Sequence, residues 1–160
     1  MDEHRGMLYK VCRLYCFTEA DRQDLFQEIV IQLWRSWPAF RREAKFSTWL
    51  YRIALNTAIS GLRRQRRLIT PADPEQLLAE LQDIQYVADK EEQLQLLYAA
   101  IDRLTEVEKA LTLLYLEDRS YQEMEEILGL SQNNLRVKMN RIKDKLRKIT
   151  KEVAHGIGKS

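Results

Sequence analysis

The stretch KFSTWLYRIALNTAISGLRRQRR, residues 45–67, carries two kinds of signal. Apolar residues recur in it at helical spacing, which predicts one buried helix face. That face consists of Leu50, Ile53, Ala54, Ala58 and Leu62. A helix that only fills a core does not need the aromatic start STWLYR or the arginine run RRQRR at its end. The question is therefore what this helix binds on its other faces.

The composition of the 160 residues favours an all-α protein. The chain has only 5 glycines and 3 prolines, which argues for long helices and against a β-sandwich or barrel. We find no apolar run long enough to cross a membrane and no signal-peptide core, so we expect a cytoplasmic protein without membrane insertion. Cys12 and Cys16 lack the partners of a zinc site, so we expect reduced thiols, no metal and no cofactor.

Charge is distributed unevenly, although the net charge is only +2. Residues 1–68 carry a net charge of +6, residues 69–108 of −8 and residues 109–160 of +4. Two basic blocks around an acidic middle suggest that each end of the chain meets a polyanion. We expect two small helical domains, residues 1–68 and 93–152, joined by a linker at 69–92 in which Pro71 and Pro74 discourage helix.

Capping residues predict where the helices begin and end. Thr18 is the expected N-cap of a helix that Pro38 stops, and Ser47 is the expected N-cap of the next one. In the second half, TEVE (105–108) and SYQE (120–123) both fit the capping-box pattern. Gly129 fits the left-handed end of a helix, and Ser131 the start of the last one.

The segment SYQEMEEILGLSQNNLRVKMNRIKDKLRK, residues 120–148, has the layout of a helix-turn-helix. In DNA-binding proteins the second helix of this motif enters the major groove. Asn and Arg side chains match adenine and guanine edges, and lysines suit phosphates. The expected DNA-facing residues are Ser131, Asn133, Asn134, Arg136, Val137, Lys138, Asn140 and Arg141. The alternative is a solvated amphipathic helix in a small bundle.

Aromatic and basic residues alternate in FRREAKFSTWLYR, residues 40–52. Rings that stack on bases and cations that follow the backbone are the chemistry of single-stranded nucleic-acid binding. Asn56 could bind an unpaired base edge or, equally, another helix. Spacing alone favours a core position for Trp49. The preceding helix, DLFQEIVIQLWRSW (24–37), is apolar over a wide arc, which fits either a central core helix or a helix that docks on a partner.

Residues 24–67 closely resemble the second conserved region of bacterial sigma factors, and the helix-turn-helix resembles their fourth region. The short tether between them is similar to that of the extracytoplasmic-function (ECF) group. The resemblance implies a two-domain helical protein that binds core RNA polymerase and promoter DNA, single-stranded at the −10 element and duplex at the −35 element. It also implies contacts with the polymerase clamp coiled coil and flap, and an anti-sigma factor as a further partner.

The resemblance assigns residues to three surfaces. The surface for core polymerase comprises Asp24, Gln27, Glu28, Ile31, Leu33 and Trp34. The surface for the −10 element comprises Phe40, Arg41, Arg42, Lys45, Phe46, Ser47, Thr48, Trp49, Arg52, Asn56, Arg63 and Arg64. The surface for the −35 element is the DNA-facing set of the helix-turn-helix, in which Val137 would contact a thymine methyl group.

Two other classes of protein are weighed against a sigma factor. A stand-alone helix-turn-helix regulator would need neither the aromatic and basic loop nor the wide docking helix. A nucleic-acid enzyme would need a cluster of carboxylates or histidines. His4 and His155 lie in the terminal segments, and the acidic residues are spread over helix surfaces and caps. We therefore expect a binding protein and no enzyme.

Overall fold

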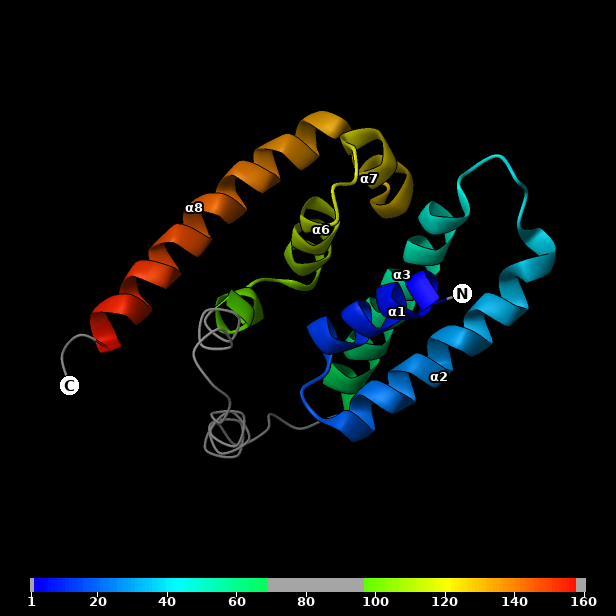
Figure 1. Ribbon diagram of the computed structural model, residues 1–160, viewed down its shortest axis with the longest axis horizontal. Coiled ribbons are helices and arrows are strands. Elements are labelled where there is room, and N and C mark those ends of the chain that lie inside the picture. Colours follow the sequence, from blue (N-terminus) through cyan, green and yellow to red (C-terminus); the bar gives the residue numbers. More distant parts are fainter. Residues whose placement is uncertain (1, 69–96, 158–160) are drawn as a thin grey trace.

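The computed structural model describes residues 2–68 and 97–157, and over these residues it contains helices and no strand (Figure 1). The first half consists of α1 (Asp2–Tyr15), α2 (Glu19–Ser36), the short 3₁₀ turn η1 (Trp37–Ala39) and α3 (Phe46–Leu68). The second half consists of a helix at 97–102, α6 (Glu106–Leu116), α7 (Tyr121–Leu128) and α8 (Gln132–Ile157). The expected linker lies outside the described residues.

Helix α3 is the centre of the first half, where it packs against both α1 and α2. Its predicted face is buried at Leu50, Ala54 and Ala58 and half-buried at Ile53 and Leu62. The buried arc is wider than the sequence predicts, because Thr48, Tyr51 and Leu55 are buried as well. The reason is that α3 also contacts α7 of the second half.

The predicted caps of the first half are correct at Thr18 and wrong at Ser47. The backbone N–H of Asp21 donates to Thr18 Oγ1 across 3.1 Å, so Thr18 caps α2. Helix α2 ends at Ser36, and Pro38 lies in the 3₁₀ turn that follows. Helix α3 begins before Ser47, whose hydroxyl accepts a hydrogen bond from Arg119 instead of capping the helix.

One of the two predicted capping boxes is complete. Thr105 Oγ1 accepts from the backbone N–H of Glu108 across 3.3 Å, and Glu108 Oε2 accepts from the backbone N–H of Thr105 across 3.1 Å. Ser120 accepts from the N–H of Glu123 across 3.1 Å, but the Glu123 carboxylate pairs with two cations instead of closing the box. The second box is therefore only half formed.

The helix-turn-helix has the predicted ends. Gly129 has a φ of 72°, the left-handed conformation that ends α7, and Ser131 accepts from the N–H of Asn134 across 3.3 Å at the start of α8. The predicted apolar stripe of α8 faces the core. Its members Leu135, Met139 and Ile142 are buried, and Leu146 and Ile149 are half-buried.

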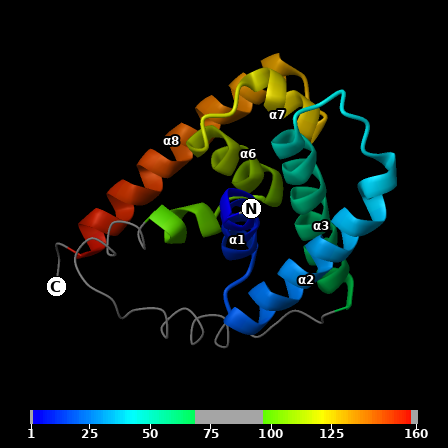
Figure 2. The same cartoon turned by 45° about the vertical axis from the view of Figure 1, so that its right-hand side comes forward.

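The two halves pack against each other, and their buried residues form one continuous core. Figure 2 shows α6 and α7 beside α1 and α3, in agreement with the contacts between these helices. The core joins Val11, Ile29 and Leu55 of the first half to Leu111 and Leu114 of the second. Within residues 2–68 and 97–157, no helix combines the length and apolar character needed to cross a membrane.

Candidate polymerase and nucleic-acid interfaces

Helix α2 exposes large apolar side chains along one side. Trp34 is 82% exposed, and Val30 and Ile31 are 43% and 44% exposed. A shallow hollow lies beside them, lined by Phe26, Gln27, Val30 and Ile31. Only Ile29 of this helix is fully buried, so the wide apolar arc does not mark a central core helix. We call this exposed side of α2, which carries Val30, Ile31 and Trp34, the docking strip.

The predicted polymerase-binding residues fall into two groups on α2. Asp24, Gln27, Glu28, Ile31 and Trp34 are exposed, at spacings of three and four that place them on one face. Leu33 is half-buried and packs against the core. The structure thus places five of the six predicted residues on one exposed face, while Leu33 lies on the side of the helix that packs against the core.

Four rings form an aromatic cluster between η1 and the start of α3: Trp37, Phe40, Phe46 and Trp49. The ring centroids of Phe40 and Trp49 are 4.8 Å apart, those of Phe46 and Trp49 are 5.6 Å apart, and Trp37 stacks on Phe40 at 5.7 Å. The rings therefore pack against one another, and Phe40 and Phe46 anchor the two ends of the basic loop, residues 41–45. Trp37 and Phe46 still expose 56% and 36% of their surface.

A cavity of about 300 Å³ lies beside the aromatic cluster. It is lined by Glu43, Ala44, Thr48, Trp49, Arg52 and, from α7, Glu126. Thr48 is 3% exposed, and its Oγ1 has no hydrogen-bond partner among the described residues. Trp49 thus lines a cavity and is only partly a core residue. A buried hydroxyl without a partner is costly unless a ligand or water binds it.

The arginines predicted for the −10 surface are exposed where their side chains are described, and Arg52 lines the cavity. Arg41, Arg42, Arg52 and Arg64 are exposed, while the side chain of Arg63 lies outside the described part of the chain. Asn56 is exposed as well and is therefore not a buried contact between helices. It lies four residues after Arg52, so the two share a face of α3. Lys45 is exposed but pairs with Glu123 of α7 at 3.4 Å.

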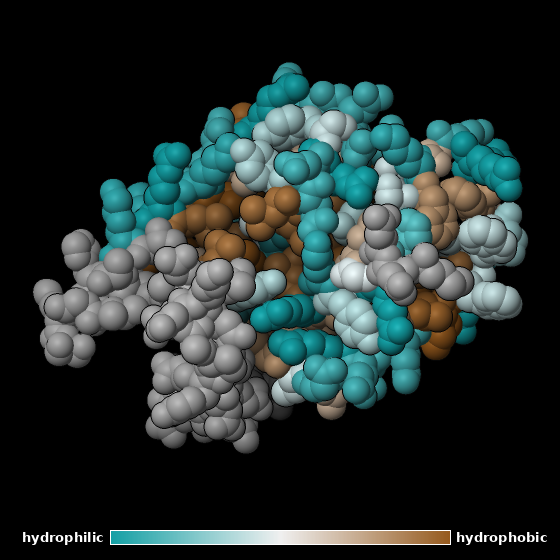
Figure 3. Space-filling model, in the orientation of Figure 1, coloured by the Kyte–Doolittle hydropathy of each residue, from teal (hydrophilic) through white to brown (hydrophobic). Residues whose placement is uncertain are grey.

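The N-terminal part of α8 presents the predicted DNA-facing residues to solvent. Asn133, Asn134, Arg136, Val137, Asn140 and Arg141 are exposed, and Lys138 is half-buried. Ser131 uses its hydroxyl in the cap of α8. Figure 3 shows hydrophilic side chains along the outer edge of α8, and hydrophobic ones gathered between α8 and α6. The helix thus offers one polar face and buries the other.

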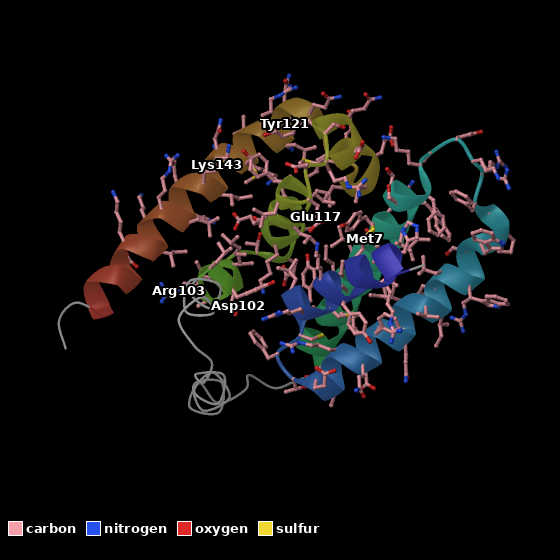
Figure 4. All side chains as sticks on the ribbon, viewed as in Figure 1. Met7, Asp102, Arg103, Glu117, Tyr121 and Lys143 are labelled. Atoms are coloured by element: carbon pink, nitrogen blue, oxygen red, sulfur yellow. The ribbon has the colours of Figure 1, made fainter. Side chains whose placement is uncertain are left out.

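Polar contacts join the two halves at several places. Arg119 Nη1 donates to Ser47 Oγ across 3.0 Å, and its guanidinium lies 5.3 Å from the ring centroid of Tyr51. The Tyr15 hydroxyl donates to the carbonyl of Glu106 across 2.6 Å. Figure 4 shows Glu117 at the end of α6, where its carboxylate pairs with Lys10 of α1. We call these contacts the interdomain interface.

Burial changes the acidity of several groups. Burial and, to a smaller extent, Glu117 raise the pKa of Tyr51 to about 12, while Arg119 opposes the rise. The pKa of Tyr15 is raised by burial and by Glu106. Burial also raises the pKa of Cys12 to about 11 and that of Cys16, so both thiols stay protonated near neutral pH. Within residues 2–68 and 97–157, no group of three His, Cys, Asp or Glu is arranged to hold a metal.

Comparisons with known proteins agree with the division into two halves. A family model described as Sigma-70 region 2 matches residues 1–68, and one described as Sigma-70, region 4 matches residues 94–146. The chain is 30% identical over 135 residues to the ECF RNA polymerase sigma-E factor of Escherichia coli K12, covering 78% of this chain and 71% of that protein. It is 27% identical over 150 residues to the ECF RNA polymerase sigma factor SigM of Mycobacterium tuberculosis. This match covers 91% of this chain and 72% of that protein.

A solved structure has the same fold. Sigma factor RpoE from Bartonella quintana, in complex with the anti-sigma factor NepR, matches with a TM-score of 0.69 and 19% identity over 91% of both chains. An all-helical fold that joins region 2 to the region 4 helix-turn-helix defines a sigma factor. The chain belongs to the extracytoplasmic-function group of RNA polymerase sigma factors, which confirms the resemblance seen in the sequence.

Proposed function

We propose that this sigma factor uses three separate surfaces in transcription initiation. The docking strip of α2 binds core RNA polymerase at its clamp coiled coil. The aromatic cluster with its cavity binds the opened −10 element, and the N-terminal part of α8 reads the −35 element as duplex. Residues 1–68 and 93–152 act as the two binding domains, and residues 69–92 connect them.

The exposure of Trp34 is the observation that best supports docking through α2. A tryptophan that exposes 82% of its surface, beside exposed Ile31, is unfavourable in water and is typical of a protein interface. The exposed polar residues Asp24, Gln27 and Glu28 precede these side chains on the same helix, which suits one edge of such an interface. The region 4 domain makes the second contact, with the polymerase flap.

The cavity beside Trp49 supports binding of an unpaired base. Its wall combines the ring of Trp49, the cation of Arg52 and Thr48, whose unpaired hydroxyl is itself buried. Stacking and hydrogen bonding to one base need such groups, and exposed arginines along α3 and the loop supply the charge that follows the DNA backbone. Asn56 is exposed beside Arg52 and is available to a base edge.

The chain acts in the cytoplasm together with the polymerase, which carries out the synthesis of RNA. We assign no catalytic step and no cofactor to the chain itself. An anti-sigma factor is the expected regulator, and it would cover the docking strip or the basic surfaces. The related RpoE of Bartonella quintana was solved in complex with such a factor.

The proposal is tested by mixing the purified chain with bacterial core polymerase and a library of genomic fragments. Stable binding to core polymerase and run-off transcripts with discrete new start sites are expected. Alignment of the start sites would yield both promoter elements. The alternative, a stand-alone helix-turn-helix regulator, predicts tight binding to duplex DNA without polymerase and no new transcripts.

A further inference from the structure

Two contacts connect α7 to the first turns of α8. The guanidinium of Arg136 lies 5.0 Å from the ring centroid of Tyr121, and Gln132 Nε2 donates to Glu125 Oε2 across 3.1 Å. Residues 121 and 125 are four apart on α7, and residues 132 and 136 are four apart on α8. Since residues four apart share a helix face, one face of α7 meets one face of the leading turns of α8.

The two partners in the contact between Arg136 and Tyr121 differ in their exposure to solvent. The ring of Tyr121 is half-buried and packs against the hydrophobic core, so it is a fixed platform. Arg136 is exposed, and its Nη1 donates to Asn133 Oδ1 across 3.5 Å. Figure 4 shows Tyr121 where α7 meets the start of α8. The ring thus limits the directions in which the guanidinium can point.

We infer that Tyr121 is a positioning residue for promoter recognition: its ring orients the Arg136 guanidinium toward one base pair of the −35 element. This inference rests on the proposed function of α8. Arginine recognises guanine through two parallel hydrogen bonds, which require a defined orientation of the guanidinium plane. A side chain held before binding loses less conformational freedom when it binds, so the platform increases discrimination without touching a base.

The chain offers a matched control on the same helix. Lys143 Nζ lies 4.6 Å from the ring centroid of Tyr115, so α8 makes a second contact of the same kind two turns further on. Figure 4 shows Lys143 beyond the leading turns of α8. Removal of the Tyr115 ring changes a comparable cation–ring contact but leaves Arg136 untouched.

The experiment uses holoenzyme assembled from the full chain and core polymerase. Its binding is measured on a promoter found by start-site mapping and on every single base-pair change of its −35 element. Arg136→Ala should abolish discrimination at one base pair and thereby identify it. Tyr121→Leu should reduce discrimination at that same base pair by about 2- to 5-fold, the range of an exposed cation–ring contact. Tyr121→Phe and Tyr115→Leu should preserve it.

A double-mutant cycle separates positioning from a general structural effect. In the Arg136→Ala background, Tyr121→Leu should have no further effect on the affinity for the promoter. Equal weakening of all −35 variants, or the same loss in that background, would overturn the inference. The inference would also be overturned if Tyr121→Leu kept full discrimination at the base pair where Arg136→Ala loses it. If Arg136→Ala discriminates as well as the unchanged chain, the proposed base contact fails, and the inference fails with it.

Discussion

The guanidinium of Arg119 donates to the hydroxyl of Ser47 across 3.0 Å, and the two residues are 72 positions apart in the sequence. Ser47 belongs to the segment matched by region 2, and Arg119 to that matched by region 4. Asp118, with a φ of 55°, forms the turn that presents Arg119 to α3. This contact links the two halves beside the surface assigned to the −10 element.

Arg119→Ala is expected to weaken the interdomain interface. The change removes the hydrogen bond to Ser47, the pairing with Glu123 at 3.6 Å and the contact with the Tyr51 ring. We expect a loss of about 1–2 kcal/mol in the free energy of unfolding. Small-angle X-ray scattering should show a larger radius of gyration. Arg103→Ala, which removes an exposed pairing with Glu152, is the control. Equal behaviour of both variants would contradict the prediction.

Trp34→Ala is expected to impair binding to core polymerase without destabilising the fold. The side chain is 82% exposed, so the free energy of unfolding should change by less than about 0.5 kcal/mol. The loss of an interface hot spot costs about 2 kcal/mol or more, so affinity should fall by roughly 30-fold. Titration of labelled core polymerase measures this affinity. Unchanged affinity would remove Trp34 from the docking strip.

Leu33→Ala is the counterpart from the same helix. Leu33 packs against the core, so this change should lower the free energy of unfolding, which Trp34→Ala should not do. The affinity of the remaining folded chain for core polymerase should stay close to that of the unchanged protein. A specific loss of affinity without loss of stability would restore Leu33 to the docking surface.

Leu111→Ala and Leu116→Ala should differ strongly in stability, although both lie in α6. Leu111 has no exposed surface, whereas Leu116 is 56% exposed. The first change leaves a cavity in the shared core and should cost about 2–5 kcal/mol. The second should cost less than about 0.5 kcal/mol. Denaturant unfolding measures both, and a single cooperative transition that shifts as a whole is expected because both halves share this core.

Much of the local structure is readable from the sequence, because caps act over three or four residues. Thr18, Thr105 and Ser131 each bind a backbone N–H three residues later, as their patterns predict. The cap at Ser47 was wrong because its hydroxyl binds Arg119, a residue from the other half. No local pattern contains that information.

The same limit applies to the candidate sites. The spacing of Asp24, Gln27, Glu28 and Ile31 is a property of one helix, so their common face was predictable. The cavity at Trp49 depends on Glu126 of α7, and the role inferred for Tyr121 depends on how α7 meets α8. Such contacts depend on how two helices pack against each other, and the sequence pattern of one helix does not specify this packing.

Alkaline pH is expected to destabilise the interdomain interface through Tyr51. Its hydroxyl has a folded pKa of about 12, above the ordinary value of 10.0. As the pH rises above about 10, the unfolded chain loses a proton that the folded chain keeps, so stability falls by up to about 1.4 kcal/mol per pH unit until about pH 12. Tyr51→Phe should lose less stability than the unchanged protein between these pH values. The two proteins differ in this one ionisable group, so parallel curves would contradict the prediction.

The free chain is expected to bind promoter DNA weakly. Glu123 pairs with Lys45, and Glu126 lines the cavity beside Trp49, so α7 places carboxylates where the −10 strand is proposed to bind. Electrophoretic mobility shifts with a −10 single strand should show tighter binding by Glu123→Gln and Glu126→Gln than by the unchanged chain. The control is Glu152→Gln, an exposed change far along α8. Equal affinities would show that these carboxylates do not oppose DNA.

Permanganate footprinting of a promoter obtained by start-site mapping tests the central claim most directly. Permanganate oxidises thymines that are unpaired. With core polymerase and this chain together, thymines of the −10 element should become reactive, and with either protein alone they should stay unreactive. Reactive thymines with core polymerase alone, or tight protection of duplex by the chain alone without any opened thymine, would contradict the account.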